Sequence, residues 1–304
     1  HKEIDYWASS PSASEGIPEE YTHGDTHYWG VWWGKEPFKN FNTKISSFMS
    51  EYGFQSFPEY SSFKKFAEGQ DRDMYSEVMK SHQRSSIGNA TIEEYLDRSF
   101  RKPLGFEELL YMSQLLQADG IQTAIEAHRR NKDRCMGSLY WQLNDCWPGA
   151  SWSSIDYYGK WKALHYKVKE SFAPVIISHE FVNEDLQLTV VSDLLNDFEG
   201  EIEVVLSEFK DIEKILRWNQ KVKIQANSKK QVLTIPSDQL TSGIDQKHTY
   251  LQLFLFDKTG VISKKNVYFL PFKDIILPRP ELEFSTKNDK NNKLYITVTS
   301  KSFA

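Results

Sequence analysis

A single acidic residue, Glu51, stands at the end of a short apolar run and two positions before Gly53. The run and its continuation read FMSEYGFQS over residues 48–56. A carboxylate at this place is expected at the C-terminal rim of a buried strand, where parallel α/β barrels place their chemistry. Glu51 is therefore the first candidate for a catalytic residue. A surface glutamate beside a strand end has the same local pattern, so this alternative stays open.

A second segment repeats this arrangement over residues 135–149, CMGSLYWQLNDCWPG. It begins with an apolar run long enough for a buried strand, continues with polar and aromatic residues, and stops at Pro148 and Gly149. Two strand ends of this kind can contribute to one pocket.

Composition limits the classes of function. The chain has 304 residues and a formal net charge of −5, so it can bury a sizeable core and is expected to hold two or more domains. Because the charge is mild, we expect neither nucleic acid nor an anionic membrane as a partner. No apolar run approaches the ~20 residues that a membrane-spanning helix needs. The first residues have neither a methionine nor the pattern of a signal peptide, so we expect a piece of a longer protein.

Metal ligation is not indicated. Cys135 and Cys146 are compatible with free thiols in either redox environment. His23 and His27 are four residues apart, but their segment has the pattern of a strand, which excludes the helical two-ligand geometry. No Cys/His spacing typical of zinc sites is present. We therefore expect no metal and no cofactor.

The first half of the chain predicts alternating strands and helices. Eight of nine tryptophans lie before residue 162, which indicates that this half carries the recognition surface. Residues 25–33 and 48–51 have strand patterns, residues 100–134 have helical spacing, and residues 136–143 form another apolar run. The helical spacing comes from Leu109, Leu110, Met112, Leu115, Leu116, Ile121 and Ile125. The order strand, helix, strand is typical of a parallel barrel or a doubly wound sheet.

From about Pro174 the pattern changes to short strands separated by turns. The predicted strands are 186–192, 202–206, 231–235, 251–256 and 261–270, and this spacing predicts an antiparallel, immunoglobulin-like β-sandwich over residues 174–276. Residues 282–300 again have the pattern of a strand, a polar turn and a second strand. They follow a proline-containing linker. We therefore expect a second, truncated sandwich over residues 277–304.

Several of these segments together resemble a known family. The motifs are SEYGFQS (50–56), GSLYWQLND (137–145), GKWKALHY (159–166) and FAP (172–174). In this order and spacing they are similar to the C-terminal part of a family 2 glycoside hydrolase, specifically a β-mannosidase. The resemblance implies that residues 1–173 form the C-terminal half of a (β/α)8 TIM barrel, ahead of the sandwich.

The resemblance also implies a retaining glycosidase with Glu51 as its nucleophile. Such an enzyme needs a second, protonated carboxyl group ~5–5.5 Å away to protonate the leaving oxygen. By similarity, Trp141 forms an apolar floor under the sugar, which suits the C–H face of a pyranose ring. Ordinary packing in the barrel core is the alternative role for Trp141.

Further substrate-binding candidates lie near both motifs. Tyr28 or His27 can hydrogen-bond Glu51 and hold it ionised, although strand neighbours alternate faces and both cannot point into the pocket of a regular strand. Trp33 is favoured together with Tyr28, and core packing is the alternative for both. Asn144 and Asp145 are candidates for binding sugar hydroxyls, with turn stabilisation as the alternative.

One part of the family's active site has no counterpart here. The resemblance implies an acid/base glutamate after an asparagine, upstream of residue 1, whereas the pair Asn183–Glu184 of this chain falls in a predicted hairpin. We therefore expect the missing N-terminal portion of the same protein to be a partner, the fragment to be inactive alone, and open barrel edges that permit a homo-oligomer.

The expected activity is hydrolysis of terminal β-mannosyl residues in oligosaccharides or glycoconjugates. A β-galactosidase, β-glucuronidase or exo-β-glucosaminidase of the same family, or a non-catalytic carbohydrate-binding or structural module, stays open as an alternative. The substrate class suggests a secreted or periplasmic protein, or a lysosomal one in a eukaryote.

Overall fold

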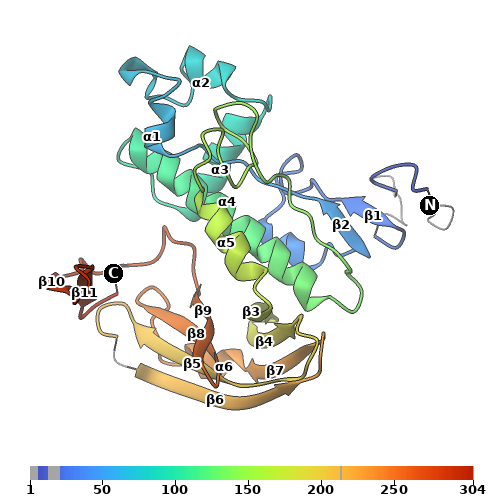
Figure 1. Ribbon diagram of the computed structural model, residues 1–304, viewed down its shortest axis with the longest axis vertical. Coiled ribbons are helices and arrows are strands. Elements are labelled where there is room, and N and C mark those ends of the chain that lie inside the picture. Colours follow the sequence, from blue (N-terminus) through green and yellow to red (C-terminus); the bar gives the residue numbers. More distant parts are fainter. Residues whose placement is uncertain (1–5, 13–20, 213, 304) are drawn as a thin grey trace.

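A computed structural model describes residues 6–12, 21–212 and 214–303 of the chain (Figure 1). The molecule is a mixed helix and sheet structure in its first part and has sandwich-like antiparallel sheets in its second. Helices α4 and α5 lie between the short strands β1 and β2 and the sandwich below them. No helix in the described ranges is both long and apolar enough to cross a membrane.

The first part is built on three parallel chain segments. Strand β1 (Asp25–His27) pairs with β2 (Phe48–Glu51), and Met49 of β2 forms a parallel bridge with Ser138. Residues 136–143 were expected as a continuous strand, but their one described β-bridge is at Ser138. The described residues thus show fewer strands here than the four of a half barrel.

The predicted helix is confirmed as α4 (Phe106–Arg130), which begins just after Gly105. Its buried apolar side chains, including Leu110, Leu116 and Ile121, pack with the aromatic core of the first part. Helix α5 (Ala163–Ser171) runs beside it. The helix predicted from the apolar spacing therefore lies directly behind the segment that follows Glu51.

An excursion of short helices follows β2 and was not expected from the sequence. It comprises α1 (Tyr60–Phe63), the 3-10 turn η2 (Gly69–Asp71), α2 (Glu77–Ser81) and α3 (Gly88–Ser99). Another 3-10 turn, η1 (Phe38–Asn42), lies between β1 and β2. Figure 1 shows these helices at the end of the molecule opposite the sandwich. The excursion leaves the sheet after β2 and returns through α3 to α4.

The second part contains two antiparallel sheets. One has the order β3-β4-β7 and the other β6-β5-β8-β9, and the apolar core between them includes Leu188, Val204 and Leu253. The strands are β3 (Val175–Val182), β4 (Asp185–Ser192), β5 (Phe198–Glu208), β6 (Lys214–Ile224), β7 (Lys229–Ile235), β8 (Thr249–Asp257) and β9 (Gly260–Tyr268), with helix α6 (Ser237–Thr241) after β7. All five strands predicted in this region are confirmed by these bounds.

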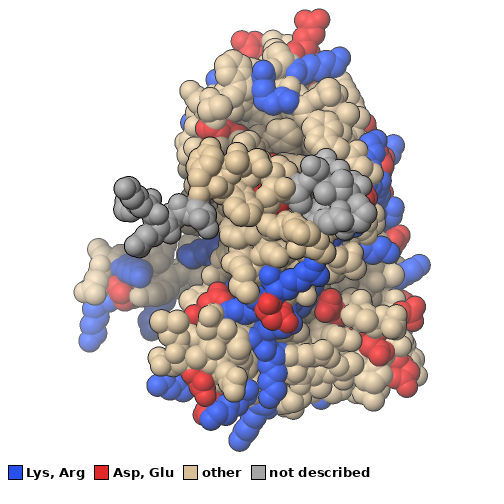
Figure 2. All heavy atoms as spheres, turned by 90° about the vertical axis from the view of Figure 1, so that its right-hand side faces the viewer, with Lys and Arg blue, Asp and Glu red and all other residues tan. Residues whose placement is uncertain are grey.

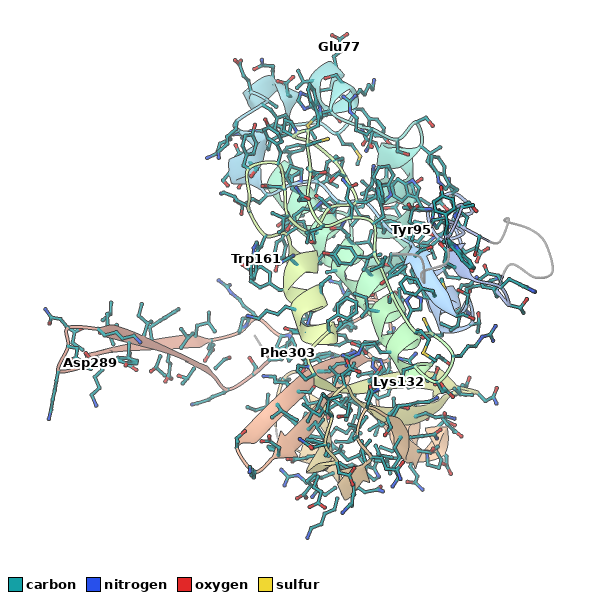
Figure 3. All side chains as sticks on the ribbon, turned by 45° about the vertical axis from the view of Figure 1, so that its right-hand side comes forward. Glu77, Tyr95, Lys132, Trp161, Asp289 and Phe303 are labelled. Atoms are coloured by element: carbon teal, nitrogen blue, oxygen red, sulfur yellow. The ribbon has the colours of Figure 1, made fainter. Side chains whose placement is uncertain are left out.

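A two-stranded hairpin ends the chain. Strands β10 (Leu282–Asn288) and β11 (Leu294–Ser300) pair with each other and with no other described strand. Figure 3 shows the hairpin extending from the body, with Asp289 near its tip, whereas Phe303 lies back beside the sandwich. The predicted strand, turn and strand are therefore confirmed, and the second sandwich stays a prediction.

The end of α4 contacts the sandwich through a network of charged side chains. Glu126 is 4% exposed and pairs with Lys265 of β9, and Arg129 pairs with Asp193 at an Nη2–Oδ2 distance of 2.7 Å. Burial raises the pKa of Glu126 and the neighbouring Lys265 lowers it, and the lysine prevails, so this carboxyl stays ionised. The two parts are thereby joined by one buried ion pair, Glu126–Lys265, and by a second pair whose aspartate is half exposed.

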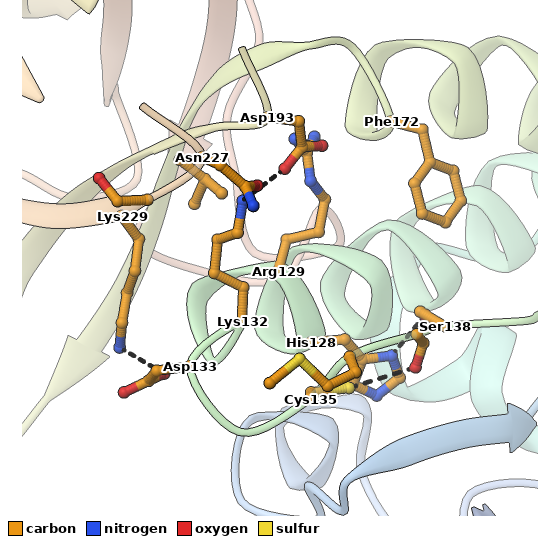
Figure 4. A pocket seen from close by; sticks show the side chains of 14 residues that line it. His128, Arg129, Lys132, Asp133, Cys135, Ser138, Phe172, Asp193, Asn227 and Lys229 are labelled. Carbon is orange, nitrogen blue, oxygen red and sulfur yellow. Dashed lines mark hydrogen bonds and ion pairs between the residues drawn. The ribbon is translucent and has the colours of Figure 1, made fainter. Parts of the chain in front are cut away.

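A cavity of about 630 Å³ lies at this junction (Figure 4). Its lysines are already paired: Lys132 Nζ lies 2.7 Å from Asp193 Oδ1, and Lys229 Nζ lies 3.1 Å from Asp133 Oδ1. The space-filling view in Figure 2 shows basic and acidic residues interspersed on the face that it presents. The cations at the junction thus serve to hold the two parts together.

Candidate functional site

Glu51 is the last residue of β2, and two side chains meet its carboxylate. His27 Nδ1 lies 3.2 Å from Glu51 Oε2, and Trp29 Nε1 donates to the same oxygen at 3.2 Å. The Glu51 side chain is 27% exposed, so it is supported on one side and open to a ligand on the other. Within the described ranges no donor reaches Oε1.

An irregularity in the sheet explains this arrangement. The register between β1 and β2 shifts between Thr26 and His27, so that His27 pairs with Glu51, and Tyr28 N donates to Glu51 O at 2.8 Å. A bulge of this kind redirects the side chains that follow it. As a result, His27 and Trp29 both reach the Glu51 carboxylate.

Tyr28 has a different partner from the one expected. Its hydroxyl donates to Glu36 Oε2 at 2.6 Å, and its ring packs edge-on against Phe41 in the core. Burial and the hydrogen bond to Glu36 raise the pKa of Tyr28 above its ordinary range. Of the two expected partners of Glu51, the structure therefore brings His27 to the carboxylate and leaves Tyr28 in the pocket wall.

A cavity of about 390 Å³ is lined in part by His27 and Trp29, the two side chains that contact this carboxylate. The residues lining it are Tyr21, His27, Tyr28, Trp29, Gly30, Trp33, Gly34, Glu36 and Lys44. Its volume is at the low end of the range for small-molecule pockets, about 300–1,000 Å³. The candidates His27, Tyr28 and Trp33 thus line one cavity, and Trp33 is 54% exposed at its surface.

Trp141 lies against the segment that continues from Glu51. Its backbone N donates to Tyr52 O at 2.8 Å, and its side chain is 43% exposed. A Cβ added at Gly53 would lie 2.5 Å from Trp141 O and 3.1 Å from atoms of Trp29 and Trp152. Only glycine permits this approach, so the glycine of the motif brings the Trp141 segment close to the nucleophile segment.

Asn144 and Asp145 lie beyond Trp141 and differ in their surroundings. Asp145 Oδ2 accepts hydrogen bonds from Ser151 Oγ at 2.6 Å and Ser153 Oγ at 2.5 Å. Asn144 is exposed and pairs through its backbone with Ile155. The carboxylate of Asp145 therefore stabilises its own loop, which is the alternative left open by the sequence.

Two side chains of the site, Trp29 and Glu36, were not among the predicted residues. Strand alternation places Trp29 on the same face as His27, but nothing in the sequence reveals the bulge that directs both at Glu51. Glu36 follows a turn in which Glu36 N donates to Gly30 O at 3.1 Å, and such a turn has no strong sequence signature. Within the described ranges no group of three potential metal ligands gathers.

Behind the nucleophile strand lies a buried polar chain. Tyr52 and Ser138 share a hydrogen bond with an O–O distance of 2.8 Å, and His128 Nδ1 lies 2.7 Å from Ser138 Oγ. His128 is 1% exposed. Burial, assisted by the charge of Arg130, lowers the pKa of His128 to about 3, so this imidazole stays neutral in the folded chain.

This buried imidazole predicts acid lability. In the unfolded chain histidine titrates near 6.5, so the unfolded state gains a proton as pH falls from about 6.5 toward 3 while folded His128 does not. Through this group, each unit by which the pH falls in this window lowers the free energy of unfolding by about 1.4 kcal/mol. Urea unfolding at pH 7 and pH 5 measures the effect. In His128→Asn the loss of unfolding free energy between these two pH values should be smaller, because one protonating group is gone. An equal loss in both proteins would contradict the assignment.

The chain is similar in sequence to known proteins. Residues 184–274 match the family model of the Mannosidase Ig/CBM-like domain. A β-mannosidase of Capra hircus is 32% identical over 213 residues, 64% of this chain and 24% of the relative. A β-mannosidase B of Aspergillus niger is 31% identical over 218 residues, 66% of this chain and 26% of the relative. The chain thus spans about a quarter of the length of these relatives.

Solved structures of glycosidases share the fold of this chain. The β-D-mannosidase from Dictyoglomus thermophilum superposes with a TM-score of 0.84 at 30% identity, over 92% of this chain and 34% of that one. The exo-chitosanase of Amycolatopsis orientalis superposes with a TM-score of 0.68 at 17% identity, over 93% of this chain and 37% of that one, and shows the fold alone. The resemblance indicated by the motifs is therefore confirmed: the chain is homologous to a C-terminal portion of the family 2 β-mannosidases.

Proposed function

We propose that this chain is part of a retaining exo-β-glycosidase that removes terminal β-mannosyl residues from oligosaccharides or glycoconjugates. The observation that carries the proposal is the carboxylate of Glu51, held through one oxygen by His27 and Trp29, which both line a cavity. A supported but accessible carboxylate is suited to attack an anomeric carbon. Trp141, close to the same segment, supplies an apolar face for the sugar ring.

The general acid of this reaction is proposed to come from outside the chain. Two carboxyl groups near Glu51 are unsuitable for the role. Hydrogen bonds from Tyr28 and Asn40 lower the pKa of Glu36. Burial raises the pKa of Asp25, but hydrogen bonds from Ser10, Ser50 and Ser12 outweigh it and bring this pKa well below the ordinary value. Both groups are ionised at neutral pH and have no proton to give to a leaving oxygen.

The three parallel segments support the proposal that residues 1–173 are the C-terminal half of a TIM barrel. An open parallel sheet leaves unpaired edges, and barrel closure removes them. We propose that a preceding portion of the same protein supplies the remaining strands and the acid/base glutamate. Below, "the longer protein" means this chain joined to that portion. For such a glycosidase we propose a secreted, periplasmic or lysosomal setting.

A panel of aryl β-glycosides tests the proposal. The longer protein should hydrolyse the β-mannoside faster than the β-galactoside, β-glucuronide and β-glucosaminide, and the released mannose should have the β configuration at first, because two displacements retain it. The 304-residue chain alone should be silent on mannobiose, since acid assistance is worth on the order of 10²–10⁴-fold. Preference for another glycoside would reassign the sugar, and binding without turnover would favour the non-catalytic module.

Trp141 provides a more specific prediction. In the longer protein, Trp141→Ala should cost about 1–3 kcal/mol of transition-state binding, because the sugar loses a large apolar surface. The comparison of kcat/KM for an aryl β-mannoside measures this loss. Trp161→Ala is the matched control, since Trp161 is 44% exposed and packs on His165 and Tyr166 of α5. Equal activities of the two variants would remove Trp141 from the sugar site.

A further inference from the structure

Lys162 is a lysine with almost no access to solvent. It is 1% exposed and directly precedes α5. Its Nζ donates to Ser56 O at 3.2 Å and to Ser151 O at 3.1 Å. Lysine is almost never fully buried unless it is paired, yet among the described residues this ammonium is held by backbone carbonyls. A buried cation of this kind calls for an explanation.

The two carbonyls belong to chain segments that are already paired with each other. Ser56 N donates to Ser151 O at 2.9 Å, and Ser151 N donates to Ser56 O at 3.1 Å. Ser56 belongs to the segment that continues from Glu51, and Ser151 belongs to the loop that follows Trp141. Lys162 therefore adds a charged donor at the point where these two segments meet.

Gln117 of α4 binds the same junction from another element. It is completely buried, its Nε2 donates to Phe54 O at 2.8 Å and to Ser153 O at 3.3 Å, and its Oε1 accepts from Ser56 Oγ at 2.7 Å. Like Lys162, this one side chain thus contacts both segments.

The junction is continuous with the backbone of Trp141. Gln142 N donates to Trp152 O at 3.1 Å, and Ser154 N donates to Gln142 O at 3.0 Å. The residue after Trp141 is therefore paired with residues 152 and 154. Between them lies Ser153, whose carbonyl oxygen accepts from Gln117. A shift of the loop would move Trp141 relative to Glu51.

We propose that Lys162 and Gln117 are positioning residues of the sugar site: they fix the loop at residues 151–154, and with it Trp141, against the segment that carries Glu51. The inference rests on the proposed function of this site. Neither side chain is required to touch the sugar.

The protonation state of Lys162 agrees with this role. Burial lowers its pKa to about 8, although the charges of Asp145 and Asp156 oppose the shift. The ammonium is therefore mostly charged at neutral pH, and hydrogen bonds from charged donors are stronger than those from neutral ones. An apolar side chain of the same length would fill the space without holding either carbonyl.

The test compares two lysine-to-methionine variants of the longer protein. Lys162→Met keeps the bulk and removes both hydrogen bonds, and Lys223→Met is the control because Lys223 of β6 pairs with Glu199 on the surface, where the two side chains are 68% and 70% exposed. For 4-nitrophenyl β-mannoside, Lys162→Met should raise KM about tenfold or more, since small misplacements of binding groups have effects of this size. Its kcat should change by less than about threefold, because His27 and Trp29 still hold Glu51. Lys223→Met should leave KM unchanged.

Amide hydrogen exchange on the same proteins gives an independent readout. Lys162→Met should increase exchange at residues 142–154, and Lys223→Met should not. An unchanged KM in Lys162→Met, or equal exchange in the two variants at residues 142–154, would overturn the positioning role. If the wild-type protein hydrolyses no glycoside of the panel, the proposed function fails, and the exchange pattern alone then decides whether Lys162 fixes the Trp141 loop.

Discussion

In the longer protein, Glu51→Ala should abolish nearly all turnover of aryl β-mannosides while the fold stays intact. The expected loss is large because the variant removes the atom that forms the covalent glycosyl intermediate. Substitution of a partly exposed side chain at the end of β2 should cost little stability. Steady-state kinetics and far-UV circular dichroism measure the two effects.

Added azide separates loss of the nucleophile from a general defect. In Glu51→Ala, azide can occupy the space of the carboxylate and attack the anomeric carbon, which should restore product with inverted configuration. Glu94→Ala is a control, because Glu94 pairs with Lys35 and Arg98 on the surface of α3 and should leave turnover unchanged. Wild-type activity in Glu51→Ala would contradict the assignment of the nucleophile.

The sequence predicted those elements whose apolar residues are regularly spaced. The period of α4 and the alternation in β4 and β8 both reflect one face buried against a core. Strand β6 was missed because polar and charged residues fill much of it, and among its described side chains only Val222 and Ile224 are buried. A strand with so short a buried stretch carries little hydrophobic pattern.

Local motifs predicted the position of Glu51 at the end of β2, whereas the roles of Glu51 and Trp141 in a sugar site stay predictions. The contacts of Glu51 were less predictable from the sequence, because a register shift between Thr26 and His27 sets the direction of the side chains that reach it. Tyr28 illustrates this limit: its sequence position suggested Glu51 as a partner, whereas its hydroxyl reaches Glu36. Lys162 lies within a motif of the sequence, but the pairing of two distant loops, which only tertiary structure reveals, explains its burial.

The buried charges at the end of α4 predict how the two parts of the chain depend on each other. Glu126 pairs with Lys265 and accepts from Ser178 Oγ at 2.8 Å, and Arg130 Nη1 donates to Ser178 Oγ at 2.6 Å. A helix of the first part thereby contacts strands β3 and β9 of the sandwich. Loss of one charge leaves the other buried without its partner, which is more costly than loss of both.

Lys265→Met should therefore destabilise the chain by about 3–5 kcal/mol, because Glu126, 4% exposed, loses the counterion that offsets the burial of its carboxyl group. The double variant Glu126→Met/Lys265→Met should recover most of that loss, since two apolar side chains of similar volume replace the pair. Urea unfolding at pH 7 measures both, and Lys223→Met is the control: Lys223 pairs with Glu199 on the surface, where the two side chains are 68% and 70% exposed, so its midpoint should not change. A double variant as unstable as the single one would show that the methylene packing of Lys265, rather than its charge, joins α4 to the sandwich.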